Sequence, residues 1–206
     1  MATTTHREAD PVREELVEAA LRLLASDGAE ALVLRRVASA ARVSTMCVYS
    51  RFGDKLGLLH AVHAGGVERL ADVMSEAGGA SDPTRRLIDL GVAYRRFAMS
   101  NPALYTLMYE RMVGFTPSAQ QRATVMEKTL SPLSQAMGEA ADLGMIVADD
   151  EKTAAYNFWA AAHGAVSLEL AGQTGGPDAE ESYRGVLDNT LRGMRSTGEM
   201  PPVGGR

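Results

Sequence analysis

The stretch GAEALVLRRVASAARVSTMCVYSRFGDKLGLLH occupies residues 28–60 and decides the fold of the N-terminal part of the chain. It contains two short apolar patterns, at residues 34–41 and 45–52, and only three residues separate them. Each pattern is long enough for about two helical turns, and the interval between them suits a tight turn. We therefore predict two brief helices joined as a helix-turn-helix hairpin.

A longer helix is predicted to precede this hairpin. Asp10 is placed to cap it, and Pro11 suits the first helical position because the missing N–H of proline is not needed there. The helix is expected to end at Gly28, a residue type that favours helix ends. Its apolar face is predicted to hold Leu16, Ala19, Ala20, Leu23 and Leu24.

Helical periodicity continues behind the hairpin almost to the end of the chain. Gly-Gly, Asp-Pro and Asn-Pro pairs, together with Pro117 and the Asp149-Asp150 pair, divide this part of the sequence into six segments. β-Branched residues are scattered and never alternate with polar ones, so no strand is predicted. The fold class is therefore all-α with about nine helices. The six later helices are expected near residues 54–77, 83–100, 102–113, 117–143, 150–170 and 178–195.

Composition indicates a folded protein of the cytoplasm. Apolar residues make up 46% of the 206 residues and charged residues 23%, as in ordinary globular proteins. Cys47 is the only cysteine, which excludes an intramolecular disulfide and fits a reducing compartment. The N-terminus has no apolar segment of a secretory signal, and His163 and Glu169 interrupt the apolar residues 158–171. We expect no membrane association.

The charge is divided unevenly along the chain. The formal net charge is −5, but residues 28–60 hold five Lys or Arg side chains against two acidic ones. Residues 61–206 hold 13 basic and 18 acidic side chains. A basic hairpin on an acidic chain is compatible with a polyanionic partner, because the distribution of charge matters more than its sum.

The order of these signals resembles the TetR family of bacterial transcription regulators. A long first helix ends at Gly28, Val37-Ala38 lies in the second helix, and Val43-Ser44 closes the turn. Val48-Tyr49-x-x-Phe52-x-x-Lys55 then spans the third helix and the start of the fourth. Each of these motifs alone is weak evidence for the family, but their combination at this spacing is specific to it. The resemblance implies a homodimer with an N-terminal three-helix head and a larger helical domain for ligand binding and dimerisation.

Within this resemblance the head binds double-stranded operator DNA. The helix after the turn would enter the major groove, with Thr45 and Met46 nearest to the base edges. Arg35 could reach a guanine or a phosphate, and Tyr49 and Lys55 carry over as phosphate contacts. The alternative is that Tyr49 is a core aromatic and the arginines form a solvated face. The full predicted DNA-binding set is Arg35, Arg42, Ser44, Thr45, Met46, Tyr49 and Lys55.

Two positions depart from the family pattern. Val33 stands at the N-cap of the second helix, where the family usually has Thr or Ser, and losing such a cap costs about 0.5–2 kcal/mol. Arg42 follows Ala41, where the family usually has Gly. A left-handed Arg42 would cost roughly 1–2 kcal/mol. We hypothesise that Arg42 offsets this strain by contacting a DNA phosphate; the alternative is a tolerated surface substitution.

The C-terminal part resembles a TetR subfamily marked by Trp-x-x-x-His-Gly. Residues 157–172 read NFWAAAHGAVSLELAG, with the motif at Trp159, His163 and Gly164. This helix is apolar on almost every face, so it must be buried on two sides. The resemblance implies that one side lines a ligand cavity and the other joins the last helix in a bundle across the two-fold axis. The predicted dimer contacts are Tyr183, Leu187, Leu191 and Met194.

Trp159 and His163 lie four residues apart and so share a helical face. A histidine there is either a satisfied core group or a ligand contact, and methionines at helical spacing are usually plain core. Eleven methionines nevertheless allow an adaptable cavity for a hydrophobic or amphipathic effector, whose binding would release a repressor from a palindromic operator. The predicted ligand-binding set is Tyr94, Phe97, Tyr105, Met108, Met112, Met126, Met137, Trp159 and His163.

Two other functional classes were weighed. An enzyme is disfavoured because the sequence has no Gly-rich phosphate loop or nucleophile elbow. His60-x-x-His63 lacks an accompanying cluster of carboxylates or cysteines, so no metal, cofactor or catalytic residue is expected. A helical module that does not bind DNA, such as a ligand carrier, is the second alternative. The predicted domains are a DNA-binding domain at 10–56 and a ligand-binding and dimerisation domain at 57–196, between disordered tails at 1–9 and 197–206.

Overall fold

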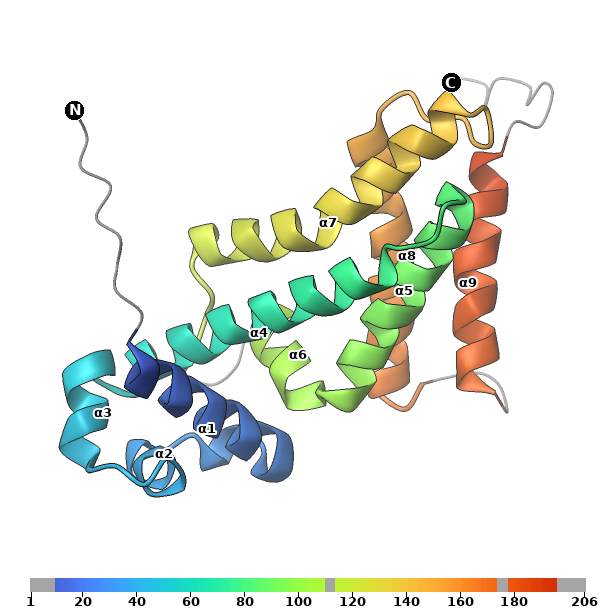
Figure 1. Cartoon of the computed structure of the whole chain (residues 1–206). Coiled ribbons are helices and arrows are strands. Elements are labelled where there is room, and N and C mark those ends of the chain that lie inside the picture. The colour runs from blue at the N-terminus through green and yellow to red at the C-terminus, as the bar shows by residue number, and fades with distance from the viewer. Residues whose placement is uncertain (1–9, 110–113, 174–177, 196–206) are drawn as a thin grey trace, which may run out of the picture. The chain divides into compact units, whose positions relative to one another are not determined.

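The computed structural model of the chain describes residues 10–109, 114–173 and 178–195 (Figure 1). Within these ranges the chain forms nine α-helices and one short 3-10 helix and contains no β-strand. The predicted all-α class is therefore confirmed. The predicted tails at 1–9 and 197–206 and the predicted ligand residue Met112 lie outside the described residues.

The helices follow the predicted segments closely. The head contains α1 (Pro11–Asp27), the 3-10 helix (Ala29–Ala31), α2 (Leu34–Ala40) and α3 (Thr45–Phe52). The later helices are α4 (Lys55–Ala77), α5 (Pro83–Ser100), α6 (Pro102–Tyr109), α7 (Ala119–Asp142), α8 (Glu151–Leu170) and α9 (Ala179–Met194).

Aspartate side chains begin five of these helices. Asp10 accepts hydrogen bonds from the backbone N–H groups of Val12 and Arg13, both at 3.1 Å. The aspartates before α4, α5, α8 and α9 accept from N–H groups of the first turn in the same way. Such a carboxylate satisfies N–H groups that have no partner within the helix and interacts favourably with the helix dipole. This is why Asp-Pro at 10–11 and 82–83 marked helix starts correctly.

Three helices end in the same backbone motif, in which two N–H groups beyond the helix donate to carbonyls of its last turn. The left-handed residue of the motif is Gly144 after α7, with φ 68°, and Gly172 after α8, with φ 69°. After α2 the same position is held by Arg42, with φ 56°. Glycine has no Cβ to clash in this region, so Arg42 carries a strain that the two glycines avoid.

The chain divides into two compact units. The first contains the residues up to Arg69 together with Asn101–Ala123, and the second contains Leu70–Ser100 together with the residues from Thr124 onward. The first unit therefore extends beyond the predicted head of residues 10–56 and includes α6. Helices α4 and α7 each contribute residues to both units.

In the first unit α1 packs against α2, α3 and α6. Leu16, Leu24 and Val48 are at most 1% exposed and lie at the centre of this core. A Cβ on Gly66 of α4 would lie 2.6 Å from Leu104 Cδ1 of α6. This close approach explains why α6 belongs to the first unit. The buried residues of the three N-terminal helices are Leu16, Val17, Ala19, Ala20, Leu21, Leu24, Leu34, Val37, Ala38, Val48 and Phe52.

In the second unit α5, α8 and α9 lie side by side (Figure 1). A Cβ on Gly91 of α5 would lie 2.6 Å from Leu187 Cδ1 of α9, and the Tyr183 hydroxyl donates to the Gly91 carbonyl at 2.8 Å. Tyr183, Leu187 and Leu191 are at most 3% exposed. Within one chain α5 therefore covers these three residues of the predicted dimer interface, and that interface stays a prediction. Met194, the fourth predicted interface residue, is partly exposed.

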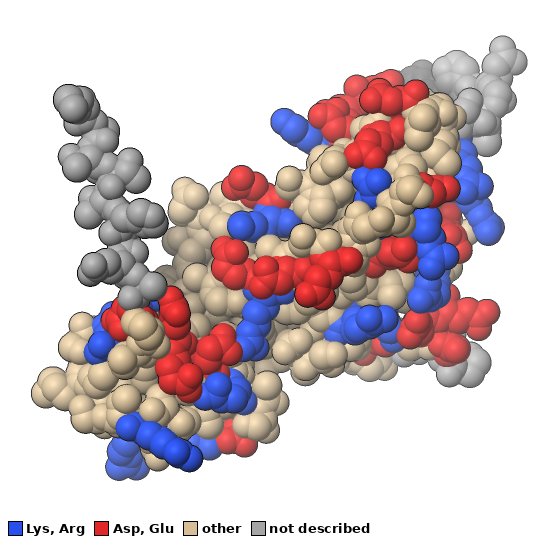
Figure 2. Space-filling view, in the orientation of Figure 1, with Lys and Arg blue, Asp and Glu red and all other residues tan. Residues whose placement is uncertain are grey.

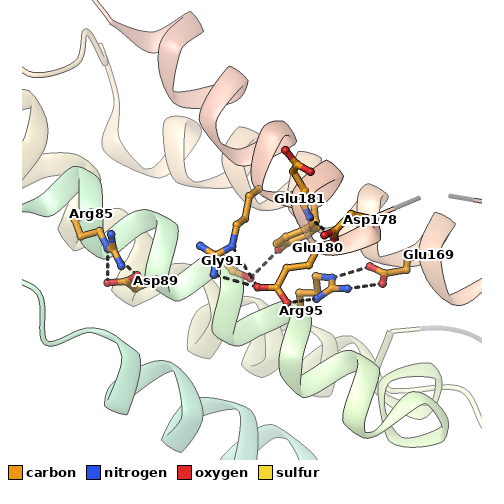
Figure 3. Close-up of polar contacts among 10 residues, drawn as sticks. Arg85, Asp89, Gly91, Arg95, Glu169, Asp178, Glu180 and Glu181 are labelled. Atoms are coloured by element: carbon orange, nitrogen blue, oxygen red, sulfur yellow. Dashed lines mark hydrogen bonds and ion pairs between the residues drawn. The ribbon is translucent and has the colours of Figure 1, made fainter. Parts of the chain in front are cut away.

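A charged cluster joins the same three helices (Figure 3). Arg95 of α5 donates to both carboxylate oxygens of Glu169 on α8 and lies 3.5 Å from Glu180 on α9. The Arg95 and Glu169 side chains are only 16% and 13% exposed. The guanidinium also lies 5.8 Å from the centre of the Tyr183 ring. These contacts fix α8 and α9 against α5.

Candidate DNA-binding surface and ligand cavity

Helix α3 has two distinct faces. Val48 and Phe52 are 0% and 8% exposed and anchor one face in the core of the first unit. Met46 and Tyr49 on the other face are 74% and 49% exposed. Residues three positions apart are neighbours on a helix, so Met46 and Tyr49 lie together on this exposed face. The exposed face of α3 is therefore available for a partner.

Ser44 caps this helix as predicted. Its backbone is extended, and its Oγ accepts a hydrogen bond from the Cys47 N–H at 3.2 Å. The first turn of α3, which starts at Thr45, is thus fixed in place before any partner binds. Val33 makes no side-chain cap to α2, as the sequence predicted.

Arg42 has a left-handed backbone conformation, so the strain that the sequence analysis attached to this conformation applies. Its N–H donates to Ser39 O at 3.1 Å, and the Val43 N–H donates to Ala38 O at 3.0 Å. Arg42 is the only residue other than glycine with positive φ among the described residues. Its side chain is exposed and makes no described ion pair.

The Lys and Arg side chains of the head differ in whether they are in an ion pair with an acidic residue. Arg35 and Lys55 are exposed at the starts of α2 and α4. Arg36 is in an ion pair with Asp27. Figure 2 shows Lys and Arg side chains gathered along the surface of the first unit over α2. The predicted DNA-binding residues are thus all placed on the exposed side of the hairpin or at the start of α4.

Sequence reasoning missed the role of Arg51, which ties α3 to the start of α1. Its Nε donates to Asp10 Oδ2 at 2.9 Å, and its Nη1 lies 3.0 Å from Cys47 Sγ. The N–H of Arg13 and the Arg51 side chain together hold the pKa of Asp10 below its ordinary value. Since 41 residues separate Asp10 from Arg51, no local pattern could have indicated this pair.

The second unit brings together three of the predicted ligand residues. The Tyr94 hydroxyl lies 2.9 Å from Nδ1 of His163, and the rings of Trp159 and His163 are 4.8 Å apart. Burial lowers the pKa of His163, which favours its neutral form. Tyr94 and Trp159 line a narrow slot between α4, α5, α7 and α8, and the slot measures about 10 Å³.

The other predicted ligand residues do not join this cluster. Phe97 and Met137 are buried in the core and are not among the residues that line this slot. Met126 lines a different groove on α7, and Tyr105 and Met108 belong to the first unit. The apolar periodicity that suggested these residues is the ordinary pattern of helices packed into a core.

A larger groove lies next to the slot. It holds about 480 Å³ and is lined by the C-terminal part of α4, by α5 and by α7. Met74 and Leu90 line both the groove and the slot. Arg86 and Lys128 supply cationic groups to the groove. Sequence reasoning missed all four residues, because none of them lies in a motif.

His60 and His63 serve the packing of the first unit. His60 Nδ1 lies 2.8 Å from Gln121 Oε1, and the His60 ring meets the edge of Phe115. His63 is 1% exposed, and burial lowers its pKa. No group of three or more metal-ligating side chains occurs in the part of the chain that the structure describes.

One face of α8 remains exposed. Tyr156 and Leu168 are 50% and 51% exposed, and Ala160 and Gly164 lie between them at intervals of four residues. These four residues, the α8 stripe, share one side of the helix. A Cβ on Gly164 would meet nothing within 4 Å. The sequence predicted that this helix is buried on two sides. Within one chain, the side that carries the α8 stripe is not covered.

Two family descriptions match the chain. Residues 16–62 match the bacterial regulatory proteins of the tetR family. Residues 87–190, about half of the chain, match the tetracyclin repressor-like C-terminal domain. Among the described helices, none has the length and apolar composition that a membrane crossing requires.

Individual relatives agree with these matches. An uncharacterised HTH-type transcriptional regulator of Mycobacterium tuberculosis is 24% identical over 190 residues, which cover 91% of this chain and 84% of that protein. The structure of a protein of unknown function from a Rhodococcus species has a TM-score of 0.78 and 26% identity, covering 94% of this chain and 100% of that one. The TetR family regulator PfmR from Thermus thermophilus has a TM-score of 0.63 and 21% identity, covering 86% and 97%.

Proposed function

Because the chain belongs to the TetR family of DNA-binding transcription regulators, we propose that it is a cytoplasmic repressor that a small hydrophobic or amphipathic effector releases from a palindromic operator. The observation that carries this proposal is the exposed face of α3, where Ser44 caps the helix and Met46 and Tyr49 point away from the core. An exposed, capped helix start can enter a major groove without rearrangement. Regulation, not catalysis, is the proposed activity.

The proposed contacts divide into two groups. Thr45 and Met46 in the first turn of α3 read base edges, whereas Tyr49 and Lys55 hold phosphates. Arg35 contacts a phosphate or a guanine from the start of α2. Arg42 contacts the DNA backbone from the turn. All of these side chains are at least partly exposed, so none must leave the core to bind.

The proposed dimer uses the α8 stripe of residues 156, 160, 164 and 168, together with the outward side of α9. Ala160 and Gly164 allow a second helix to approach closely, and Tyr156 and Leu168 would be covered by it. A two-fold dimer presents the same patch from each copy, which suits a self-complementary stripe. Two heads related in this way match a palindromic operator.

Effector binding is proposed to act through α4. This helix begins at Lys55, three residues after the end of α3, the proposed recognition helix, and continues to the groove residues Met74 and Ser75. A ligand shifts the protein between two states only by its difference in affinity for them. We also propose that Trp159 and His163 of the Trp-x-x-x-His-Gly motif belong to the effector site. Trp159→Ala is then expected to abolish the effector response while sparing operator affinity.

The experiment that tests the function selects bound fragments from the source genome and measures their affinity by gel shift at two salt concentrations. A specific operator must survive competitor DNA, and its affinity must fall steeply with salt, because binding releases counterions from phosphates. Tyr49→Phe and Lys55→Ala are the matched weakened variants. A chain that shows no preference for any fragment over competitor DNA would be a helical module without regulatory DNA binding.

A further inference from the structure

The groove and the slot of the second unit differ in chemistry. The groove residues include Ser75, Arg86, Lys128, Ser131 and Gln135, all with polar side chains. The slot is lined mainly by apolar and aromatic side chains, among them Leu133, Phe158 and Trp159. A polar space that adjoins an apolar one is complementary to a ligand with a polar end and an apolar end.

The two spaces are separated by Met74 of α4 and Leu90 of α5, which line both of them. The groove, at about 480 Å³, falls within the range of small-molecule sites, roughly 300–1,000 Å³. The slot, at about 10 Å³, is close to the smallest space that holds one water molecule. A ligand tail can enter the slot only if a side chain moves. Met74 is the side chain suited to this, because methionine is unbranched and has three rotatable side-chain bonds.

Arg86 gives the groove a fixed cation. Its Nε donates to the Ala80 carbonyl at 2.8 Å, and its Nη1 donates to Glu139 Oε2 at 2.8 Å. Its side chain is 16% exposed, so it is held in place but still reached from the groove. The Nη2 edge makes no hydrogen bond to any residue that the structure describes. Nη2 can therefore donate a charge-assisted hydrogen bond to a carboxylate.

The acidic partner of Arg86 is already engaged. Glu139 accepts a hydrogen bond from Gln135 at 3.0 Å as well as from Arg86, and these two contacts hold its pKa below the ordinary value. Glu139 therefore stays ionised and positions Arg86 and Gln135. Of the remaining charged groove residues, Lys128 and Glu127 are both exposed and carry opposite charges, so Arg86 is the cation on which the charge preference of the groove depends.

We infer that the groove and the slot are two halves of one effector site, which binds an amphipathic carboxylate with its head on Arg86 and its apolar tail in the slot behind Met74. This inference rests on the proposed function, in which the second unit senses an effector. Movement of Met74 on α4 gives the ligand a direct contact with the helix that leads to the recognition helix.

The test uses Trp159, the only tryptophan of the chain, whose emission reports on the slot without any DNA. The probes are decanoate below its micelle-forming concentration, decanamide with a neutral head, and acetate with no tail. We expect decanoate to change the emission with saturation, decanamide to bind at least about tenfold more weakly, and acetate to cause no change. Equal affinity for decanoate and decanamide, or an emission that decanoate leaves unchanged, overturns the inference.

Two variants test where the carboxylate head and the apolar tail of the ligand bind. Arg86→Gln is expected to weaken decanoate at least about tenfold and to remove the preference over decanamide. Met74→Phe fills the slot with a rigid ring and is expected to abolish the emission change, whereas Met74→Ala leaves the slot open and is expected to retain it. Circular dichroism confirms folding of each variant. If Met74→Phe folds and still gives the full change, the tail does not lie in the slot. Operator binding is measured separately, so a chain that binds decanoate but no operator refutes the proposed function and not this site.

Discussion

The guanidinium of Arg95 on α5 binds both carboxylate oxygens of Glu169 on α8, with N–O distances of 2.7 and 2.6 Å (Figure 3). Both side chains are largely buried. Removing one partner of a buried ion pair leaves the other charge without compensation, which costs about 3–5 kcal/mol. In Glu169→Ala the guanidinium keeps only the half-exposed Glu180, 3.5 Å away, so we expect the free energy of unfolding to fall by about 3 kcal/mol, the low end of this range, measured by chemical denaturation.

The matched control is the exposed pair of Arg85 and Asp89 on the same helix, which lie 3.0 Å apart. Asp89→Ala should change the free energy of unfolding by less than about 1 kcal/mol, because exposed ion pairs contribute little. Similar losses for the two variants would show that burial of the Arg95 pair has no energetic consequence.

Substitutions in the α8 stripe are expected to separate the proposed dimer. Gly164→Arg adds a charged side chain where a Cβ meets nothing within the chain, so it should leave the protomer folded. The same side chain would be buried without a partner in a helix–helix interface, and we expect monomers and a loss of operator affinity. Sedimentation measures the oligomeric state. Leu143→Arg, at a position 68% exposed on a loop, is the control that should remain dimeric.

Local sequence signals predicted most of the fold correctly. Asp10 and Pro11 mark the start of α1, and Ser44 caps α3, because capping depends on residues only a few positions apart. The hairpin of α2 and α3 was predicted from two apolar patterns and their spacing.

The candidate sites could be predicted only in part, because they depend on which face of a helix is covered. Tyr183 and Leu187 were assigned to the dimer interface, since the apolar face of α9 had no evident partner; α5 covers them. The same limit applies to Met74 and Arg86, whose helices meet only in the folded chain. Periodicity identifies an apolar face but not the element that packs on it.

Substitutions on α3 should separate base reading from phosphate binding. We expect Tyr49→Phe to weaken binding to all sequences alike, because it removes a donor to the DNA backbone. Thr45→Ala and Met46→Ala should instead change which operator is preferred, by about 1–3 kcal/mol at the affected base pair. Competition between variant operators measures this. An equal loss on all sequences for Thr45→Ala would exclude that residue from base reading.

Acid should destabilise the protein through the buried His63 and the partly buried His163. Burial lowers the pKa of both His63 and His163 from 6.5, although the hydrogen bond with the Met108 backbone partly opposes this at His63. The unfolded chain then binds protons that the folded chain does not, so stability is highest above pH 6.5 and falls as the pH drops toward the lowered pKa values. Denaturation midpoints from pH 8 to pH 5 measure this. His163→Gln should reduce the slope by at most about 1.4 kcal/mol per pH unit; an unchanged slope would mean that His163 titrates alike in both states.

Arg42 allows one substitution to test strain and DNA binding together. It holds φ 56° in the motif where Gly144 and Gly172 stand after α7 and α8. Arg42→Gly removes a clash worth roughly 1–2 kcal/mol, and greater flexibility of the unfolded chain offsets part of this gain. We therefore expect the free protein to be stabilised by about 1 kcal/mol. Gly144→Ala is the reverse control, because a Cβ there meets nothing within 4 Å and only the conformation is strained, so it should destabilise.

The same variant reports on the proposed phosphate contact of Arg42. Each phosphate contact contributes about 0.9 to the slope of log affinity against log salt concentration. Loss of one contact from each subunit of a dimer should therefore flatten the slope by about 1.8 and lower operator affinity. The stability of the free protein would then rise while operator affinity falls. A surface residue that does not contact DNA would not give this result. If Arg42→Gly raises the thermal midpoint but leaves the salt slope as it was, Arg42 is a strained surface residue that takes no part in binding DNA.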